Sequence, residues 1–371
     1  MFGKFASHPK GDLMLVVDLR SSSVGGSLFR VDKNDVPEVL FSVREPILQN
    51  AVFDMERFLP ATLKSLDFIL NKIFKSGFGA PVKVFCVLSS PWYVSETRIV
   101  NLKKEKPFIF TIDIADELLK KEVELFKVEH LAKYVEAKEE IRIIELRSIK
   151  TMLNGYETRE PIDQKVEEVE MTLFLSMSPE QVLQKIESSV AKYFHFESIK
   201  FSSFTMASFA VIKNMFADKS DFLLIDVGGE VTDISMVKKN VLRESVSFPI
   251  GRNFIPRGLS QNLNISNVEA ESYLSMARDG HLSKELELKI SPALNNLKME
   301  WLKHFQESLA NLSKDISVPY MIYLSAEKEF MNFFGEIISS EQFNQYTLTE
   351  SKFKITFLDM ELLHGVVESK H

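Results

Sequence analysis

Apolar positions in residues 221–251 fall in three short runs separated by turn residues, a pattern that predicts strand, tight turn, strand, turn and strand. The first run, FLLID, ends in Asp226. The glycine pair 228–229 supplies the first turn, because glycine accepts positive φ and brings no Cβ toward a ligand. Lys239–Asn240 is the expected turn of the hairpin that follows.

The same pattern occurs once more near the start of the chain. Residues 13–31, LMLVVDLRSSSVGGSLFRV, read as an apolar strand, small polar residues and a second strand. Asp18 ends the first of these strands, as Asp226 does in the later segment. The repeat predicts two hairpins of one design, one in each half of the chain.

The remaining periodicity predicts alternating strands and helices. Residues 13–44 predict three strands with a turn at Asp32–Asp35, and residues 54–76 predict a helix with Asp54 as N-cap and Gly77 as its stop. Further elements are a buried strand over 83–90, a helix over 111–126 and a charged face or turn over 133–142. They continue with a strand and turn over 141–157, a turn and strand over 161–178, a helix over 179–194, a strand over 198–204 and a helix over 206–216. Residues 283–313 predict one or two helices, broken near Pro292.

The motif Asp-x-Gly-Gly-x-x-Thr-Asp at residues 226–233 suits a triphosphate. Glycine N–H groups can point at phosphate oxygens, Thr232 can donate its hydroxyl, and Asp226 or Asp233 can hold a metal-bound water. An ordinary β-hairpin with a glycine turn fits the same eight residues.

Composition narrows the class of protein. With 371 residues the chain is long enough for two domains. A net charge of −7 without a basic stripe argues against a nucleic-acid partner. Cys86 is the only cysteine, which excludes an intramolecular disulfide and fits a cytoplasmic location. The start lacks the apolar core of a signal peptide, and no apolar run approaches the ~18 residues of a membrane span.

Taken together, the two Asp-ended hairpins and the order of elements resemble the actin-like ATPases of the FtsA/PilM branch. The NGY hairpin at 154–156, the helix TMASFAVI and the strand LLIDVGGEVTD carry the resemblance, which spans nearly the whole chain. It implies an α/β, actin-like (ribonuclease H-like, duplicated) two-domain fold with an α+β insert. The implied domains are a first half over 1–90 and 179–220, an insert over 91–178, and a second half over 221–371 with a helical subdomain over 252–317.

The resemblance also implies a nucleotide site for ATP and magnesium between the two halves. The implied nucleotide-binding residues are Asp18, Ser21, Ser22, Ser23, Asp226, Gly228, Gly229, Thr232, Asp233 and Gly251. Asp18 and Asp226 are expected to face each other across a cleft and to hold magnesium through water.

Several residues depart from the family pattern at this site. Arg20 replaces the glycine of the first phosphate loop, Glu230 stands where a third glycine is usual, and Arg252 replaces the second glycine of a GG pair. Where the family has Thr-Gly-Gly-Gly, this chain has Leu324–Glu327. Each change adds a Cβ or a charge beside the ligand. We therefore expect weak ATP binding and little turnover, with no confident catalytic residue.

The resemblance implies a cytoplasmic scaffold that acts at the inner face of the membrane. An FtsA-type role in cell division with an FtsZ-like partner is the first expectation, because the hairpin NGYETREPID resembles that of FtsA. The alternative is a PilM-like pilus or secretion assembly protein with a PilN-like membrane partner, and a further one is an active ATPase or sugar kinase. Self-association into dimers or filaments fits either scaffold.

The sequence of the last residues indicates whether they could bind a membrane surface. The segment KITFLDMELL alternates partly like a strand and carries two acidic residues, so it lacks the features of an amphipathic membrane helix. Residues 355–363 are instead expected to form a last strand or helix on the second half, without direct membrane insertion.

Overall fold

The computed structural model describes residues 11–31, 36–47, 55–134, 140–313, 317–340, 346, 352–359, 362 and 368–369. The turn expected at 32–35, the N-cap expected at Asp54 and residues 135–139 of the charged run lie outside these ranges. Contacts divide the chain into two compact units. No helix among the described residues is both long enough and apolar enough to cross a membrane.

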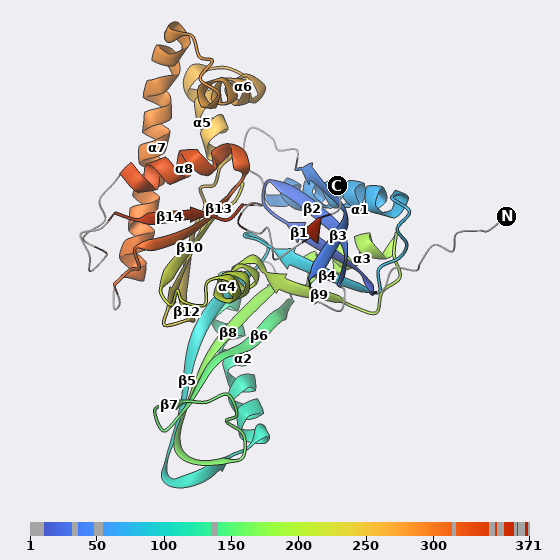
Figure 1. Cartoon of the computed structure of the whole chain (residues 1–371), viewed down its shortest axis with the longest axis vertical. Coiled ribbons are helices and arrows are strands. Elements are labelled where there is room, and N and C mark those ends of the chain that lie inside the picture. Colours follow the sequence, from blue (N-terminus) through green and yellow to red (C-terminus); the bar gives the residue numbers. More distant parts are fainter. Residues whose placement is uncertain are drawn as a thin grey trace, which may run out of the picture. The chain divides into compact units, whose positions relative to one another are not determined.

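The first unit comprises residues 1–87, 184–201 and 359–371, and it is built on a mixed six-stranded sheet (Figure 1). In spatial order its strands are β15 (Glu368–Ser369), β3 (Pro37–Pro46), β2 (Ser23–Val31), β1 (Leu13–Leu19), β4 (Lys83–Leu88) and β9 (Ile199–Ser203). The helix predicted over 54–76 is confirmed as α1 (Met55–Lys75), and α3 (Glu180–Ala191) confirms the helix predicted over 179–194. A Cβ on Gly26 would lie 2.7 Å from Cδ1 of Ile73, so this glycine lets α1 lie close to β2.

The second unit comprises residues 88–183 and 202–358 and contains a five-stranded sheet. Its strands in spatial order are β12 (Val241–Phe248), β11 (Thr232–Lys238), β10 (Phe222–Val227), β13 (Met321–Ala326) and β14 (Lys354–Phe357). The hairpin turn predicted at Lys239–Asn240 is confirmed: both residues have positive φ, 51° and 61°, as a type I′ turn requires. Strand β14 pairs parallel to β13, which confirms a strand at the start of the expected segment 355–363, and β15 follows it in the sequence.

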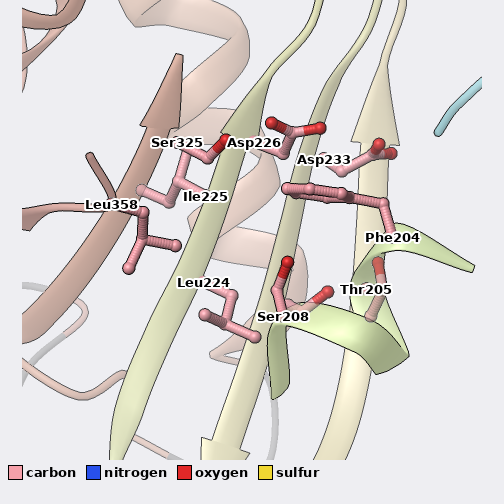
Figure 2. A pocket seen from close by; sticks show the side chains of 10 residues that line it. Phe204, Thr205, Ser208, Leu224, Ile225, Asp226, Asp233, Ser325 and Leu358 are labelled. Atoms are coloured by element: carbon pink, nitrogen blue, oxygen red, sulfur yellow. The ribbon is translucent and has the colours of Figure 1, made fainter. Parts of the chain in front are cut away.

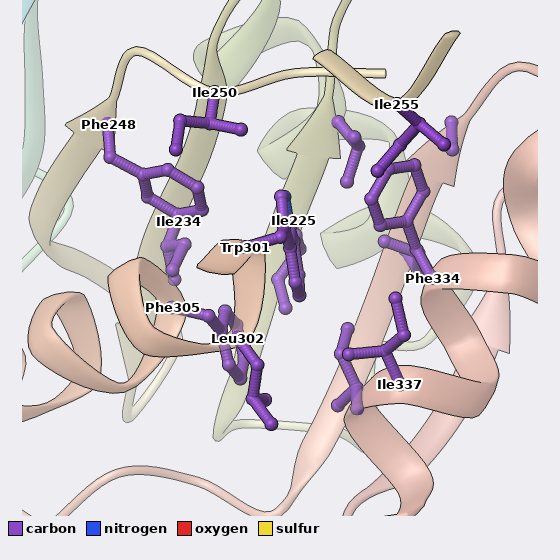
Figure 3. Packing of buried hydrophobic residues seen from close by; sticks show 14 of the residues in the cluster. Ile225, Ile234, Phe248, Ile250, Ile255, Trp301, Leu302, Phe305, Phe334 and Ile337 are labelled. Carbon is purple, nitrogen blue, oxygen red and sulfur yellow. The ribbon is translucent and has the colours of Figure 1, made fainter. Parts of the chain in front are cut away.

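Helices cover both faces of this sheet (Figure 1). On one face the helices are α7 (Lys284–Leu312) and α8 (Lys328–Ser340), and on the other face the helix is α4 (Phe204–Met215). Helix α5 (Phe254–Leu263) packs against α7, and α6 (Asn267–Arg278) packs against α5. Trp301 of α7 lies fully buried at the centre of the first core, stacked on Phe305 and in contact with Phe334 and Phe248 (Figure 3). Burial of each apolar side chain of this size stabilises the folded state by roughly 1.5–3 kcal/mol.

The predicted break near Pro292 is wrong, because α7 runs through it without interruption. A proline inside a helix removes one hydrogen bond and costs about 3 kcal/mol. Apolar residues on both sides of the proline, Ile290 and Leu297 among them, belong to one buried cluster. Packing against the sheet therefore outweighs the local cost.

The segment predicted as an α+β insert contains a four-stranded sheet and one helix. The strands in order are β5 (Val94–Phe110), β8 (Gln164–Pro179), β6 (Ile141–Leu153) and β7 (Tyr156–Glu157), and the helix is α2 (Ile112–Tyr134). Helix α2 continues two turns past its predicted end at Phe126, because residues 127–134 contain no glycine or proline. Asn154 and Gly155 have positive φ and form the turn between β6 and β7.

The domain boundaries expected from the sequence differ from the two units in places. The pairing of β15 with β3 lies in the first unit, whereas residues 221–371 were expected to form the second half. Helix α4 lies in the second unit, whereas residues 179–220 were expected to complete the first half. The expected boundaries, including the helical subdomain over 252–317, stay a prediction.

A buried carboxylate ties the sheet of the insert segment to the start of α4. Glu145 on β6 is 5% exposed and accepts hydrogen bonds from the hydroxyls of Ser176, Ser202 and Ser203 at 2.9, 2.5 and 2.6 Å. The backbone N–H of Ser203 donates to the same carboxylate at 2.9 Å. Ser203 is also the N-cap of α4. Glu145 therefore holds three segments distant in sequence through fully used acceptor oxygens.

We expect Glu145→Ala to lower the free energy of unfolding by about 2–4 kcal/mol, because two buried hydroxyls, one partly buried hydroxyl and one buried N–H would lose their acceptor. Urea unfolding followed by circular dichroism measures the change. Glu157→Ala, on the exposed β7 with an ion pair to Lys150, is the matched control and should change stability by less than about 0.5 kcal/mol. Equal effects of the two substitutions would contradict a structural role for Glu145.

Candidate functional site

The glycine turn after β10 is locked to the start of α5 by backbone contacts. The N–H of Gly228 donates to the carbonyl of Val231 at 2.9 Å and closes the turn. The carbonyls of Gly228 and Gly229 accept from the N–H groups of Arg252 and Asn253 at 2.8 and 2.9 Å. These two carbonyls thus help to position the first residues of α5.

Gly251 is required where it stands for a steric reason. A Cβ at this position would lie 2.4 Å from the carbonyl oxygen of Gly228 and 2.5 Å from that of Gly229. Backbone atoms cannot move aside as the end of a flexible side chain can, so any other residue would separate the two segments. The three glycines expected at the site therefore do lie together.

Thr232 lies at the centre of the same turn and is fully buried. Its hydroxyl donates to the carbonyl of Ile250 at 2.7 Å and accepts from Nε1 of Trp301 at 3.3 Å. The side chain expected to donate to a phosphate thus connects the turn to the hydrophobic core in this structure.

Asp226 and Asp233 are directly opposite each other on β10 and β11, so their carboxylates project from the same face of the sheet (Figure 2). Phe204 of α4 lies beside them, and Ser325 is the partner of Asp226 on β13. Oδ1 of Asp233 accepts from the hydroxyl of Ser247 at 2.5 Å and from that of Ser90 at 2.9 Å.

Burial raises the pKa of Asp233 to about 6, and the nearby charge of Asp226 acts in the same direction. The hydrogen bonds from Ser247 and Ser90 favour the ionised form and oppose the shift. A carboxyl with a pKa near 6 is ionised in most molecules at pH 7 and titrates within the physiological range.

In the first unit, Asp18 is paired with two arginines. Nη2 of Arg44 donates to Oδ2 of Asp18 at 2.6 Å, and Nε of Arg20 donates to the same oxygen at 3.2 Å. Burial raises the pKa of Asp18, but the two guanidinium groups outweigh it and the net shift is downward. Nη1 of Arg44 also donates to the hydroxyl of Ser23 at 2.9 Å, while Ser21 and Ser22 are buried in the turn between β1 and β2.

This arrangement fits magnesium poorly. Oδ1 of Asp18 is buried and accepts no hydrogen bond from the described residues, so one oxygen is left for a metal-bound water. The two guanidinium groups on Oδ2 nevertheless place two positive charges where a cation would bind. Among the described residues, no group of three or more His, Cys, Asp or Glu side chains is arranged to hold a metal ion.

The residues that depart from the family pattern pair with oppositely charged neighbours. Arg20 pairs with Asp18, and Glu230 accepts from Arg257 and, at 2.8 Å, from Asn253. Nε of Arg252 lies 2.9 Å from Oε2 of Glu327 without hydrogen-bond geometry, so this contact is ionic. The guanidinium of Arg252 also lies 5.5 Å from the centre of the Phe330 ring.

The structure thus assembles the expected residues into two groups, one in each unit. Asp226, Asp233, Thr232 and the three glycines surround one turn of the second unit. Asp18 and the three serines surround the turn between β1 and β2. That Asp18 faces Asp226 across a cleft stays a prediction. Arg44 and Arg257 were missed, because only strand register and helix packing bring them to these carboxylates.

The raised pKa of Asp233 predicts a specific pH dependence of stability. The folded chain binds a proton at Asp233 more readily than the unfolded chain, whose carboxyl has a pKa near 3.8. The penalty of the buried charge is present above about pH 6 and disappears as pH falls toward 4. Relative to Asp233→Asn, the wild type should gain up to about 3 kcal/mol of stability as pH falls from about 7.5 to 4. Urea unfolding of both proteins at each pH measures this gain.

Parallel pH profiles of the wild type and Asp233→Asn would show that this carboxyl is hydrated in the folded chain. Asp221→Asn is the control, since Asp221 is 41% exposed at the start of the same sheet and should leave the profile unchanged.

Comparison with known proteins found matches among solved structures only. No protein-family model matches the chain, and no curated protein sequence matches it. The structure of a PilM–PilN type IV pilus biogenesis complex is similar at 13% identity and a TM-score of 0.62, covering 98% of this chain and 91% of that one.

Two further structures match less well. The ethanolamine utilization protein EutJ from Carboxydothermus hydrogenoformans has 9% identity and a TM-score of 0.44, covering 96% of this chain and 87% of that one. A Bacteroides thetaiotaomicron protein with an actin-like ATPase fold and unknown function has 9% identity and a TM-score of 0.41, covering 95% of each chain. These two scores are too low to support a conclusion. The chain has the α/β, actin-like two-domain fold, with an inserted α+β segment, that its sequence predicted.

Proposed function

We propose that this chain is a PilM-like assembly protein that binds a membrane protein of the PilN type, and that its nucleotide site has lost the ability to hydrolyse ATP. The observation that supports the loss of hydrolysis is that charged side chains at the nucleotide site pair with one another. Asp18, Glu230 and Glu327 each have an arginine of the chain itself as a partner.

Hydrolysis of ATP by this fold would require magnesium and an unobstructed triphosphate. Magnesium neutralises the charge that develops during phosphoryl transfer. At Asp18 two arginines already neutralise the carboxylate, and Glu327 places a negative charge where the family has glycine. ATP would then act as a weak conformational ligand beside the glycine turn at 228–229.

The PilM-like role draws support from the extent of the similarity. The match to the PilM chain covers almost all of both chains and includes the inserted segment. The FtsA-type role in cell division is the alternative, and the turn at Asn154–Gly155, inside the segment that resembles FtsA, forms as expected. A cytoplasmic location at the inner face of the membrane, reached through a partner, fits both roles. An active ATPase or sugar kinase fits the paired charges less well.

We expect the unmodified protein to bind Mg-ATP more weakly than about 100 μM and to release no phosphate above background, because ligand binding must first break ion pairs at the site. Replacing both Arg252 and Glu327 by glycine should tighten ATP binding about tenfold, since it removes two side chains and the ion pair that a ligand would have to break. Isothermal titration calorimetry measures affinity and a phosphate-release assay measures turnover.

Lys103→Gly with Glu168→Gly is the matched control, because it also removes both members of one ion pair, here at 3.2 Å, but on β5 and β8 of the insert segment. The control should leave ATP affinity unchanged. Tight binding with steady phosphate release by the unmodified protein would refute the loss of hydrolysis and favour the ATPase alternative.

For the partner, we expect the purified protein to float with anionic liposomes only when a PilN-like protein of the same organism is reconstituted in them. The chain offers no helix, among the described residues, that could span the bilayer, so attachment should depend on the partner. Liposome flotation at physiological salt measures attachment, with FtsZ added in a parallel experiment.

Three results of the flotation experiment would count against the PilM-like role. Attachment to bare liposomes would favour a self-anchoring FtsA-type protein. Binding to FtsZ, with no response to the PilN-like protein, would favour cell division. Failure to bind either partner would leave the assembly role without support.

A further inference from the structure

A hydroxyl-lined cavity of about 170 Å³ lies within the second unit, beside Asp233. Its polar lining consists of the side chains of Ser90, Tyr93, Ser95, Thr205, Ser245 and Ser247, and of the Asp233 carboxylate. These residues come from the turn after β4, the start of β5, the first turn of α4, and strands β11 and β12. Three stretches of the sequence, residues 90–95, the start of α4 and the β11–β12 hairpin, thus place oxygen atoms around one space.

Only one of the two oxygens of the Asp233 carboxylate accepts hydrogen bonds from the described residues. Both of its hydrogen bonds, from Ser90 and Ser247, are made to Oδ1. Oδ2 accepts no hydrogen bond from any residue that the structure describes, although the residue is only 9% exposed. Oδ2 does not belong to the fully buried polar atoms that lack a partner, so a ligand or water in the cavity can reach it and supply the donor.

Further acceptors lie in the same lining. The Ser95 hydroxyl makes no hydrogen bond within the described part of the chain. Tyr93 and Thr205 bond each other at 2.9 Å, and Ser245 bonds Ser235 at 2.8 Å, so each of these pairs keeps oxygen lone pairs for an added donor.

The residues that line the cavity favour a singly charged cation as its ligand. No lysine, arginine or histidine is among the lining residues, and Asp226 adds a second negative charge on the neighbouring strand. An anion would therefore be repelled. A divalent metal is disfavoured because Asp233 is the only carboxylate among the lining oxygens, and the other oxygens are neutral hydroxyls.

We propose that this cavity binds a primary ammonium group, with Oδ2 of Asp233 as the ionic acceptor and the hydroxyl oxygens as the others. An ammonium group carries three N–H donors, which matches a site with one free carboxylate oxygen and several free lone pairs. The cavity exceeds by more than tenfold the roughly 10–15 Å³ that one water requires, so it holds the carbon chain of an amine as well as the charge.

The ammonium could come from a free amine or from a lysine side chain of a protein partner, and the chemistry at Asp233 is the same. This inference goes beyond the proposed assembly role.

The test uses ligand-observed NMR titrations of the full chain at constant ionic strength in sodium chloride. n-Butylamine is the probe for a free amine, Nα-acetyl-lysine amide is the probe for a lysine side chain, and n-butanol is the neutral analogue. We expect at least one amine to bind at least about tenfold more tightly than n-butanol, because the charged hydrogen bond to Asp233 is lost with the alcohol.

Variants locate the binding in the cavity. Asp233→Asn keeps the shape and removes the charge, and it should weaken the amine about tenfold or more. Asp221→Asn, the same change at an exposed position outside the lining, should have no effect. Ser95→Ala removes a hydroxyl with no structural partner and should weaken binding about threefold, which keeps the proposal testable if Asp233→Asn fails to fold by circular dichroism.

Tighter binding of Nα-acetyl-lysine amide would indicate a partner's lysine, and tighter binding of n-butylamine would indicate a free amine. Three results would overturn the proposal: equal affinities for amine and alcohol, unchanged amine affinity in a folded Asp233→Asn or in Ser95→Ala, or displacement of the amine by an equal concentration of potassium chloride.

Discussion

The close approach of Gly251 to the turn at Gly228–Gly229 is the constraint on which the second unit depends. A Cβ at Gly251 would lie 2.4 and 2.5 Å from two carbonyl oxygens, so only glycine allows the chain to return from β12 directly beneath this turn. The approach brings the N–H groups of Arg252 and Asn253 onto the glycine carbonyls and so starts α5. It also aligns Thr232 with Trp301, which links the polar turn to the largest apolar core of the unit.

The charged side chains near the glycine turn form ion pairs, so their contributions to stability depend on one another. An ion pair that is partly removed from water gains little net stability, because desolvation of both groups offsets their attraction. Removal of one partner is costly, since the other charge then stays uncompensated. Arg252 with Glu327, and Glu230 with Arg257, therefore resist separate replacement. Residues that look like independent departures from a family motif are coupled in the folded chain, and a ligand at the site would have to compete with them.

Features that depend on neighbouring residues were predicted correctly from the sequence, and features that depend on contacts between distant residues were not. The hairpin at Lys239–Asn240 and helix α1 were predicted because their signals lie within a few neighbouring residues. The uninterrupted α7 was not, since tertiary packing there outweighs a local proline. Likewise the candidate residues could be named from the two Asp-ended motifs, but their partners could not. Arg44 reaches Asp18 only through the register of β3 on β2, which periodicity does not specify to single residues.

Two buried carboxylates of the second unit show how hydrogen bonds separate a structural group from one able to bind a ligand. Glu145 and Asp233 are exposed by 5% and 9%, and both accept from serine hydroxyls. Glu145 receives donors from the chain on both of its oxygens. Asp233 receives both of its donors on one oxygen, lines a cavity and has a pKa raised to about 6. The second oxygen of Asp233 is therefore open to a donor from outside the chain, whereas donors of the chain itself occupy both oxygens of Glu145.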